Sequence, residues 1–211
     1  MAKLSFRFGT MGSGKSLELI KIKTNYDIQG KNCIILTSSL DTRSGLSEVS
    51  SRNGQKEKAI YIDEDTYFDI ANMKENEPIH CILVDEAQFL TKEDVLMLGD
   101  VVDDLGIPVI CFGLRTDFSG NLFDGSKALI EYADDIQELV TECFNCDKKS
   151  ILNLRLVNGR AVYTGEQIQI GDSEYLPLCR YCFKHFNELG NTRNTEQYNP
   201  ELEHEGHNHG F

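Results

Sequence analysis

Short apolar runs alternate with helical stretches along the first half of the chain. The runs have the length and composition of strands and lie at Leu4–Phe8, Asn32–Thr37, Ala59–Ile62, Ile79–Val84 and Pro108–Phe112. Segments with helical spacing lie between several of them, at residues 15–29, 66–76 and 91–104. Residues 38–58 are rich in Ser, Asp, Arg and Gly and are expected to form a loop. The alternation predicts an α/β fold with a largely parallel sheet and crossover helices.

The pattern changes near residue 140. Short alternating runs at Ile151–Val157 and Arg160–Tyr163 are joined by Asn158-Gly159, and this arrangement predicts a β-hairpin. We therefore expect a first, α/β domain at residues 1–140 and a second, small β domain at residues 141–190.

Residues 191–211 are polar and show no hydrophobic periodicity. We expect this tail to be disordered, because it offers no apolar face to bury. It contains His204, His207 and His209, so a metal site in the tail is the alternative interpretation.

Composition and charge narrow the class of partner. The 211 residues are 40% hydrophobic, which is enough for one sizeable core and a small appendage. No apolar run is long enough to span a membrane and no signal peptide is visible, so we expect a cytoplasmic protein without a membrane partner. The net charge of −13 argues against general binding to nucleic acid, whose phosphates attract cationic surfaces. Residues 1–60, by contrast, carry ten Lys or Arg against five Asp or Glu, which suits a small polyanion.

A glycine-rich sequence stands between the first predicted strand and the first predicted helix. Its residues are Gly9, Thr10, Met11, Gly12, Ser13, Gly14, Lys15 and Ser16. A loop of this pattern folds its backbone N–H groups around phosphate oxygens, and the helix that follows adds partial positive charge. Lys15 would reach the β- and γ-phosphates of a nucleotide, and the Ser16 hydroxyl would bind Mg²⁺. The alternative is an ordinary glycine-rich turn.

Two acidic residues, Asp85 and Glu86, follow the apolar run Ile82–Val84. In a protein with a phosphate-binding loop, an acid at this position binds Mg²⁺ opposite the loop serine, and Asp85 fits that role. Glu86 would face the reacting γ-phosphate, where a carboxylate takes a proton from an attacking hydroxyl or orients a water.

The seven cysteines fall into two groups. Three stand singly in apolar runs and are expected to be reduced core residues: Cys33, Cys81 and Cys111. The other four form two CxxC pairs with 32 residues between them: Cys143 with Cys146, and Cys179 with Cys182. Four thiolates in two such pairs are typical of a closed, structural Zn²⁺ site, and His185 is an alternative fourth ligand. Without an export signal, this usage indicates a reducing cytoplasm.

The segment Gly113–Phe118, which continues to Phe123, follows a predicted buried strand at its carboxyl end. Ligands bind at that edge of open α/β sheets. Phe118 and Phe123, if exposed, could stack on an aromatic base, and Arg115 could contact phosphate. A packed loop is the equal alternative.

Together these motifs resemble those of the thymidine kinases of the cytosolic, tetrameric type, and bacterial members most closely. The resemblance covers about residues 3–186. The segments that carry it are residues 11–16, Asp41-Thr42-Arg43, residues 84–89, residues 113–118, the two cysteine pairs, and Gly171 to Tyr175. It implies a P-loop, RecA-like parallel sheet and a small zinc-ribbon-like β domain that carries a lasso or lid loop.

The resemblance also implies an activity, namely transfer of the γ-phosphate of ATP to the 5′-hydroxyl of thymidine, or of deoxyuridine, in nucleotide salvage. By position it makes Glu86 the general base and Asp85 the Mg²⁺-associated acid. It adds three residues to those of the loop that contact ATP: Ala87, Gln88 and Arg43. The residues that match those enclosing the nucleoside are Met11, Phe89, Leu114, Phe118, Phe123, Gly171 and Tyr175.

Further expectations follow from the same resemblance. Residues 164–175 match a loop that holds the thymine ring mainly through backbone hydrogen bonds. A structural Zn²⁺, a homotetramer in the cytoplasm and feedback inhibition by thymidine triphosphate (dTTP) are also implied.

Three positions depart from the pattern of the family. Asn153 stands where some members have Thr near the 5-methyl group of the base, so it bears on the tolerance of 5-substituted pyrimidines. The stretch from Gly171 to Tyr175 is one residue shorter than usual, so exact lasso contacts are not carried over. Cys182 stands where many bacterial members have His as the fourth zinc ligand.

Two other functions fit part of the sequence. Asp85-Glu86-Ala87-Gln88 also resembles a motif of nucleic-acid-dependent ATPases, here combined with a zinc ribbon. Such motors normally couple two cores, for which this chain is too short, and the net charge has the wrong sign. A zinc-ribbon interaction module without nucleotide would leave the phosphate-binding loop unexplained.

Overall fold

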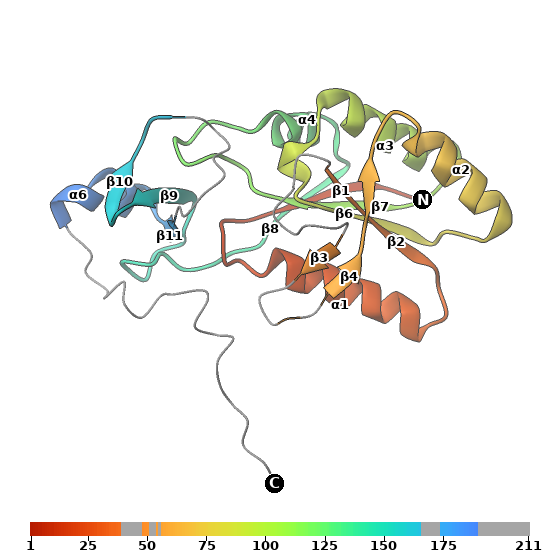
Figure 1. The fold of residues 1–211 in the computed structure, drawn as a ribbon, viewed down its shortest axis with the longest axis horizontal. Coiled ribbons are helices and arrows are strands. Elements are labelled where there is room, and N and C mark those ends of the chain that lie inside the picture. The colour runs from red at the N-terminus through yellow and green to blue at the C-terminus, as the bar shows by residue number, and fades with distance from the viewer. Residues whose placement is uncertain (39–47, 51–53, 55, 166–173, 190–211) are drawn as a thin grey trace, which may run out of the picture.

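The structure of the protein is a computed structural model, and it describes residues 1–38, 48–50, 54, 56–165 and 174–189. Figure 1 shows a central sheet between helices, with a smaller sheet beside it. The central sheet has parallel strands in the order β5-β2-β6-β7-β1-β8. These strands are β1 (Leu4–Phe8), β2 (Cys33–Ser38), β5 (Ile60–Ile62), β6 (Cys81–Asp85), β7 (Val109–Gly113) and β8 (Asp135–Glu138).

Helices cover both faces of the central sheet. They are α1 (Lys15–Ile28), α2 (Thr66–Asn76), the 3₁₀ helix η1 (Ala87–Phe89), α3 (Lys92–Leu105) and α4 (Asp124–Tyr132). Along β6, Leu83 packs in the cluster that contains Leu19 of α1, whereas Ile82 packs on the other face with the cluster that contains Leu98 of α3 and Leu129 of α4. The α/β fold with a parallel sheet is therefore confirmed. None of the helices in the described ranges combines the length and apolarity that crossing a membrane requires.

The sequence fixes both ends of α3. Thr91 Oγ1 accepts a hydrogen bond from Asp94 N at 3.1 Å, and Asp94 Oδ2 accepts one from Thr91 N at 2.8 Å, which together form a capping box. The helix ends at Gly106, whose φ of 66° lies in the left-handed region that favours glycine. These signals place the start of α3 directly after η1, and so beside the candidate acids.

Every strand and helix predicted for the first 113 residues is present, displaced by at most two residues at either end. Two elements of the central region, α4 and β8, were not predicted. The buried side of α4 begins with Gly125 and Ser126, which give no apolar signal. The strand β8 lies at an edge of the sheet and is largely exposed, so no apolar run marks it.

The expectation of a loop throughout residues 38–58 is wrong in part. Strands β3 (Glu48–Ser50) and β4 (Lys56–Lys58) form an antiparallel pair. Val49 is buried and packs in the same cluster as Leu19 of α1. One buried residue in a three-residue strand produces no periodicity, so the polar composition hides this pair.

The smaller sheet is antiparallel, in the order β10-β9-β11. Its elements, with the two short helices that follow, are β9 (Leu152–Val157), β10 (Arg160–Val162), β11 (Glu174–Leu178), α5 (Arg180–Lys184) and α6 (Phe186–Leu189). Asn158 and Gly159 have φ values of 52° and 72°, as a type I′ turn requires, so the predicted hairpin is confirmed. The domain limits at residues 140 and 190 stay predictions.

The three single cysteines are core residues, as predicted. Cys33, Cys81 and Cys111 are buried in the central sheet. Burial raises the pKa of the Cys111 thiol, which keeps this side chain protonated and unreactive near neutral pH.

Candidate active site

The candidate residues gather where strands of the central sheet end. Phe8, at the end of β1, lies opposite Gly113 at the end of β7, and Gly9 N donates to Gly113 O at 3.3 Å. The strand β6, which ends at Asp85, is the other neighbour of β7. The phosphate-binding loop, the acidic pair and the segment after Gly113 therefore share one edge of the sheet. Open α/β sheets bind their ligands at this edge.

Backbone conformation shapes the phosphate-binding loop. Gly12 and Gly14 have φ values of 78° and 81°, which glycine adopts without strain. A Cβ on Gly9 would lie 2.4 Å from Ser13 Oγ and 2.6 Å from Leu139 O, so a side chain does not fit there. Gly14 caps α1 without a side-chain hydrogen bond, so no capping side chain blocks the amides of this helix N-terminus.

Two side chains of the loop bear on anion binding. Lys15 Nζ donates to Gly9 O at 3.2 Å and to Thr10 O at 2.9 Å, so its positive charge lies over the loop. Ser13 Oγ is buried and, within the ranges that the structure describes, has no hydrogen-bond partner. Buried polar atoms without partners are uncommon, and a phosphate oxygen would satisfy this hydroxyl. The loop therefore fits a phosphate chemically.

The acidic pair adopts an unusual backbone conformation. Asp85 ends β6 in a buried position, and its Oδ1 accepts a hydrogen bond from Glu86 N at 3.0 Å. Glu86 has φ 49° and ψ 38°, in the left-handed region that is costly for a residue with a side chain. Strain of this kind persists only where the surroundings fix it, and it clusters at functional sites.

Gln88 holds the Glu86 carboxylate in place. Its Nε2 donates to Glu86 Oε2, and its Oε1 accepts a hydrogen bond from Leu114 N at 2.9 Å. Gln88 is only 1% exposed, so these bonds are shielded from water. A Cβ on Gly113 would lie 2.8 Å from Gln88 Oε1 and 3.0 Å from Gln88 N. A side chain at position 113 would therefore displace Gln88, and glycine avoids this clash. A chain of contacts thus links Glu86 to the segment after β7.

The start of α4 packs closely on η1. A Cβ on Gly125 would lie 2.5 Å from Ala87 O and 2.7 Å from Leu90 O, both of which are backbone atoms. Ser126 is fully buried, and its Oγ donates to Leu114 O at 2.5 Å. Sequence reasoning missed both residues, because glycine and serine at a helix start form no motif.

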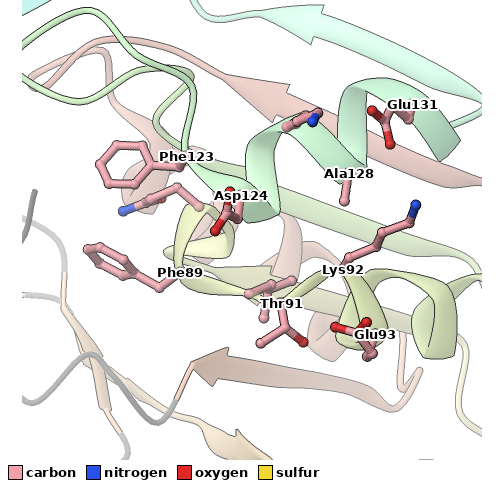
Figure 2. A pocket seen from close by; sticks show the side chains of 11 residues that line it. Phe89, Thr91, Lys92, Glu93, Phe123, Asp124, Ala128 and Glu131 are labelled. Carbon is pink, nitrogen blue, oxygen red and sulfur yellow. The ribbon is translucent and has the colours of Figure 1, made fainter.

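Aromatic rings from two segments meet at a pocket. Phe89 of η1 and Phe123 before α4 meet edge to face, with ring centroids 5.7 Å apart and planes at 84°, on the same side of the helices in Figure 2. Both rings line an open pocket of about 480 Å³, together with other residues of η1, α3 and α4. Phe118 and Phe123 are 3% and 6% exposed, so of the two equal alternatives the packed loop is the one observed, and a role of these rings at a nucleoside stays a prediction.

The phosphate-binding loop also contacts β9 of the smaller sheet and the segment just before it. Met11 N donates to Asn153 Oδ1 at 2.8 Å, and Asn153 is buried. The hydroxyls of Thr10 and Ser150 lie 2.7 Å apart in a buried hydrogen bond. Asn153, which departs from the pattern of the family, therefore accepts a hydrogen bond from the backbone of the loop.

Arg115 lies at this same junction. Its Nη2 donates to Ile151 O at 3.2 Å, and its guanidinium carbon lies 5.6 Å from the centroid of the Phe8 ring. These contacts place the Arg115 side chain at the junction of the two sheets, where it contributes to packing. They do not support the predicted contact of Arg115 with phosphate, which stays a prediction.

Arg155 on β9 is a residue that sequence reasoning missed. Its guanidinium carbon lies 3.6 Å from the centroid of the Phe118 ring, and its Nη2 donates to Thr164 O at 3.2 Å. Arg155 is 2% exposed, although charged residues are rarely buried to this degree. An arginine in an otherwise alternating apolar strand was the signal that could have found it.

The structure brings the four paired cysteines together. The sulfurs of Cys143, Cys146, Cys179 and Cys182 all lie within 4.8 Å of one another. Cys146 Sγ is 3.7 Å from Cys179 Sγ and 3.7 Å from Cys182 Sγ. Thiolates placed at about 2.3 Å around a tetrahedral Zn²⁺ lie about 3.8 Å apart, so the cluster is compatible with a zinc site. His185 packs on the Tyr181 ring, with centroids 4.7 Å apart, and is not part of this cluster.

Some candidates lie outside the described residues. These are Asp41, Thr42 and Arg43, most of the expected lasso at residues 166–173 including Gly171, and the histidines of the tail. Tyr175 is described: it lies half-buried on β11, where it pairs with Arg155 of β9.

Comparisons with known proteins agree on one family. The family profile described as "Thymidine kinase" matches residues 2–183. The chain is 49% identical over 188 residues to the thymidine kinase of Lactococcus lactis, covering 88% of this chain and 97% of that protein. It is 51% identical over 183 residues to the thymidine kinase of Lactiplantibacillus plantarum, covering 86% and 95%. A thymidine kinase of Streptococcus pyogenes is 49% identical over 189 residues, with 88% and 97% covered.

Proposed function

Because this chain belongs to the thymidine kinase family, and is therefore a kinase for ATP and thymidine, we propose that it transfers the γ-phosphate of ATP to the 5′-hydroxyl of thymidine, and also of deoxyuridine. The observation that carries the mechanism is the strained Glu86, which Gln88 holds at the sheet edge shared with the phosphate-binding loop.

The loop would hold the phosphates of ATP. Residues 9–16 supply backbone amides, Lys15 supplies positive charge, and the Ser13 hydroxyl gains a partner. Arg43, Asp85, Glu86, Ala87 and Gln88 complete the set that we assign to ATP. Mg²⁺ bound by Ser16 and Asp85 would neutralise charge on the phosphates.

Glu86 would act as the general base. Its carboxylate accepts the proton of the 5′-hydroxyl while the oxygen forms a bond to the γ-phosphorus. The bond from that phosphorus to the β,γ-bridging oxygen breaks, and ADP leaves. A nucleoside hydroxyl is a weak nucleophile while it keeps its proton, so a carboxylate placed to remove that proton would speed its attack.

Side chains from several segments would enclose the nucleoside. We assign this role to Met11, Phe89, Leu114, Phe118, Phe123, Gly171 and Tyr175. Met11 is bound through its backbone to Asn153, and Leu114 through its backbone to Gln88, so two of these positions are fixed by side chains already in place. Enclosure would also keep water from competing for the phosphate.

The four cysteines would hold a structural Zn²⁺. All four positions of a tetrahedral site are then filled by thiolates, which leaves no open position for catalysis. The metal would stabilise the small domain from which the expected lasso extends. We further propose a cytoplasmic homotetramer that dTTP inhibits, without nucleic-acid or membrane partners.

A phosphate-transfer assay tests the proposal. The protein is incubated with Mg²⁺, radiolabelled ATP and each natural nucleoside in turn, with and without single-stranded DNA. Label is expected in the monophosphates of thymidine and deoxyuridine, independent of DNA. Release of phosphate only with DNA would favour the alternative, a nucleic-acid-dependent ATPase with a zinc ribbon, and absence of ATP binding would favour a zinc-ribbon interaction module.

A further inference from the structure

Arg155 occupies the middle of the smaller sheet. On β9 it pairs with Val162 of β10 on one side and with Tyr175 of β11 on the other. The chain runs from β10 through Thr164 and Gly165 to residue 166, and β11 begins at residue 174. Arg155 therefore lies between the two strands that flank the expected lasso.

The side chain of Arg155 joins this sheet to the segment after β7. Its guanidinium carbon is 3.6 Å from the centroid of Phe118, a ring that belongs to that segment. Its Nη2 donates to Thr164 O at 3.2 Å, just beyond β10. One buried cation thus contacts the Phe118 ring, which the proposed function assigns to the nucleoside, and the backbone that leaves β10.

The backbone at Gly165 lies close to the Arg155 guanidinium. Its φ is 129°, a conformation that side-chain-bearing residues rarely adopt, and a Cβ there would lie 2.8 Å from Arg155 Nη2. The backbone therefore has a conformation that favours glycine where it approaches the guanidinium, and a larger residue at 165 would require the end of the Arg155 side chain to shift. The close approach places the guanidinium directly against the backbone that leaves β10.

We infer that Arg155 is a positioning residue for thymidine, which fixes the Phe118 ring and the backbone at Thr164 in the geometry that binds the nucleoside. The inference rests on the proposed function, because that proposal places Phe118 at the nucleoside. Arg155 acts through Phe118 and Thr164, so its replacement should raise KM for thymidine and leave KM for ATP unchanged.

The chemistry of arginine explains why this residue type stands here. Burying a charged side chain is unfavourable, and an apolar residue would satisfy a core position of β9 at lower cost. The planar guanidinium, however, stacks on an aromatic face and donates in its own plane at the same time. Lysine has the charge and the reach but lacks the plane, so it should replace arginine only in part.

The test compares Arg155→Met and Arg155→Lys with the wild type, and uses Arg160→Met, at an exposed position of β10, as the matched control. Steady-state kinetics give KM for thymidine and for ATP separately, and metal analysis and thermal unfolding report the fold. We expect KM for thymidine to rise about tenfold or more in Arg155→Met and less in Arg155→Lys, with KM for ATP within about twofold of wild type. The control should match the wild type.

Each other outcome contradicts the inference. A thymidine KM within about twofold of wild type in a folded Arg155→Met protein would overturn it, as would equal rises for thymidine and ATP. Loss of zinc and of cooperative unfolding in both Arg155 variants would show that the role is structural only. If the wild type itself does not phosphorylate thymidine, the proposed function fails first, and the inference fails with it.

Discussion

The phosphate end and the nucleoside end of the proposed site differ in how they would be built. At the phosphate end, one stretch of eight residues would form the binding surface, chiefly through backbone amides and two glycines with positive φ. At the nucleoside end, side chains would come from the loop, from η1, from the segment after β7 and from the start of α4. The smaller sheet contacts the loop through Asn153 and the Phe118 ring through Arg155.

This difference predicts which changes would weaken the binding of each substrate. The loop takes its shape chiefly from local backbone geometry, and it is joined to distant residues by the bonds of Met11 to Asn153 and of Thr10 to Ser150. An enclosure assembled from separate segments depends on every contact that holds those segments together. Loss of the cysteine cluster, of Arg155 or of the packing of α4 should therefore weaken thymidine binding more than ATP binding, whereas loss of the Asn153 bond to the loop should weaken both.

The largest effect is expected at the point where the two ends meet. Glu86→Gln keeps the size of the side chain but removes the base, so kcat should fall about 10²-fold or more while ATP affinity stays unchanged. Rate measurements with calorimetry of ATP binding check this. The control is Glu75→Gln, at an exposed site on α2, which should match the wild type. Near-normal turnover in Glu86→Gln would reject the base.

The next largest effect concerns the cysteine cluster. Cys179→Ser removes one thiolate, so the protein should lose most of its zinc, and KM for thymidine should rise about tenfold, a change of about 1.4 kcal/mol, with ATP binding kept. Metal analysis and separate KM values provide the measurement. His185→Ala, the matched variant, should keep its zinc; unchanged zinc in Cys179→Ser would remove that cysteine from the site.

A third prediction concerns the contact between α4 and η1. Gly125→Ala would bring a Cβ within 2.5 Å of a backbone carbonyl, so the free energy of unfolding should fall by about 1–3 kcal/mol, and thymidine affinity should fall with it. Gly99→Ala in α3 is the control, because nothing lies within 4 Å of its Cβ position. That variant should be neutral or stabilised by up to about 1 kcal/mol. Equal behaviour of the two variants in denaturant unfolding would contradict the packing described.

The smallest effect is expected at the bond between Met11 N and Asn153 Oδ1. Asn153→Ala leaves the Met11 amide without this acceptor, which should cost about 1 kcal/mol and raise KM for both substrates about fivefold, because the bond joins the two ends. Kinetics with each substrate varied in turn measure it. Asn72→Ala, at an exposed site on α2, should leave both KM values as they were. An increase confined to thymidine would place Asn153 in the nucleoside site alone.

The same contrast explains what the sequence could predict. The phosphate-binding loop and the acids at the end of β6 are local motifs, and their residues are read directly. The buried strands of the central sheet are equally visible, because their side chains are apolar on both faces. The hairpin could be predicted because Asn158-Gly159 favours the positive φ values of a type I′ turn.

Contacts between distant segments could not be predicted in this way. The hydrogen bond of Gln88 to Leu114 joins residues 26 positions apart, and the Met11 bond to Asn153 spans 142 positions. Nothing local in the sequence marks Gly125 as a residue beneath η1, or Arg155 as a neighbour of Phe118. Such residues become visible only when the fold brings their segments together.

The central claim is that a nucleoside hydroxyl, and not water, receives the phosphate beside Glu86. Phosphorus NMR of the reaction with Mg²⁺ and ATP, with and without thymidine, tests it most directly. The mechanism predicts thymidine monophosphate and ADP in equal amounts, with little free phosphate in either reaction. Free phosphate formed at the same rate without thymidine, and no thymidine monophosphate with it, would contradict the claim.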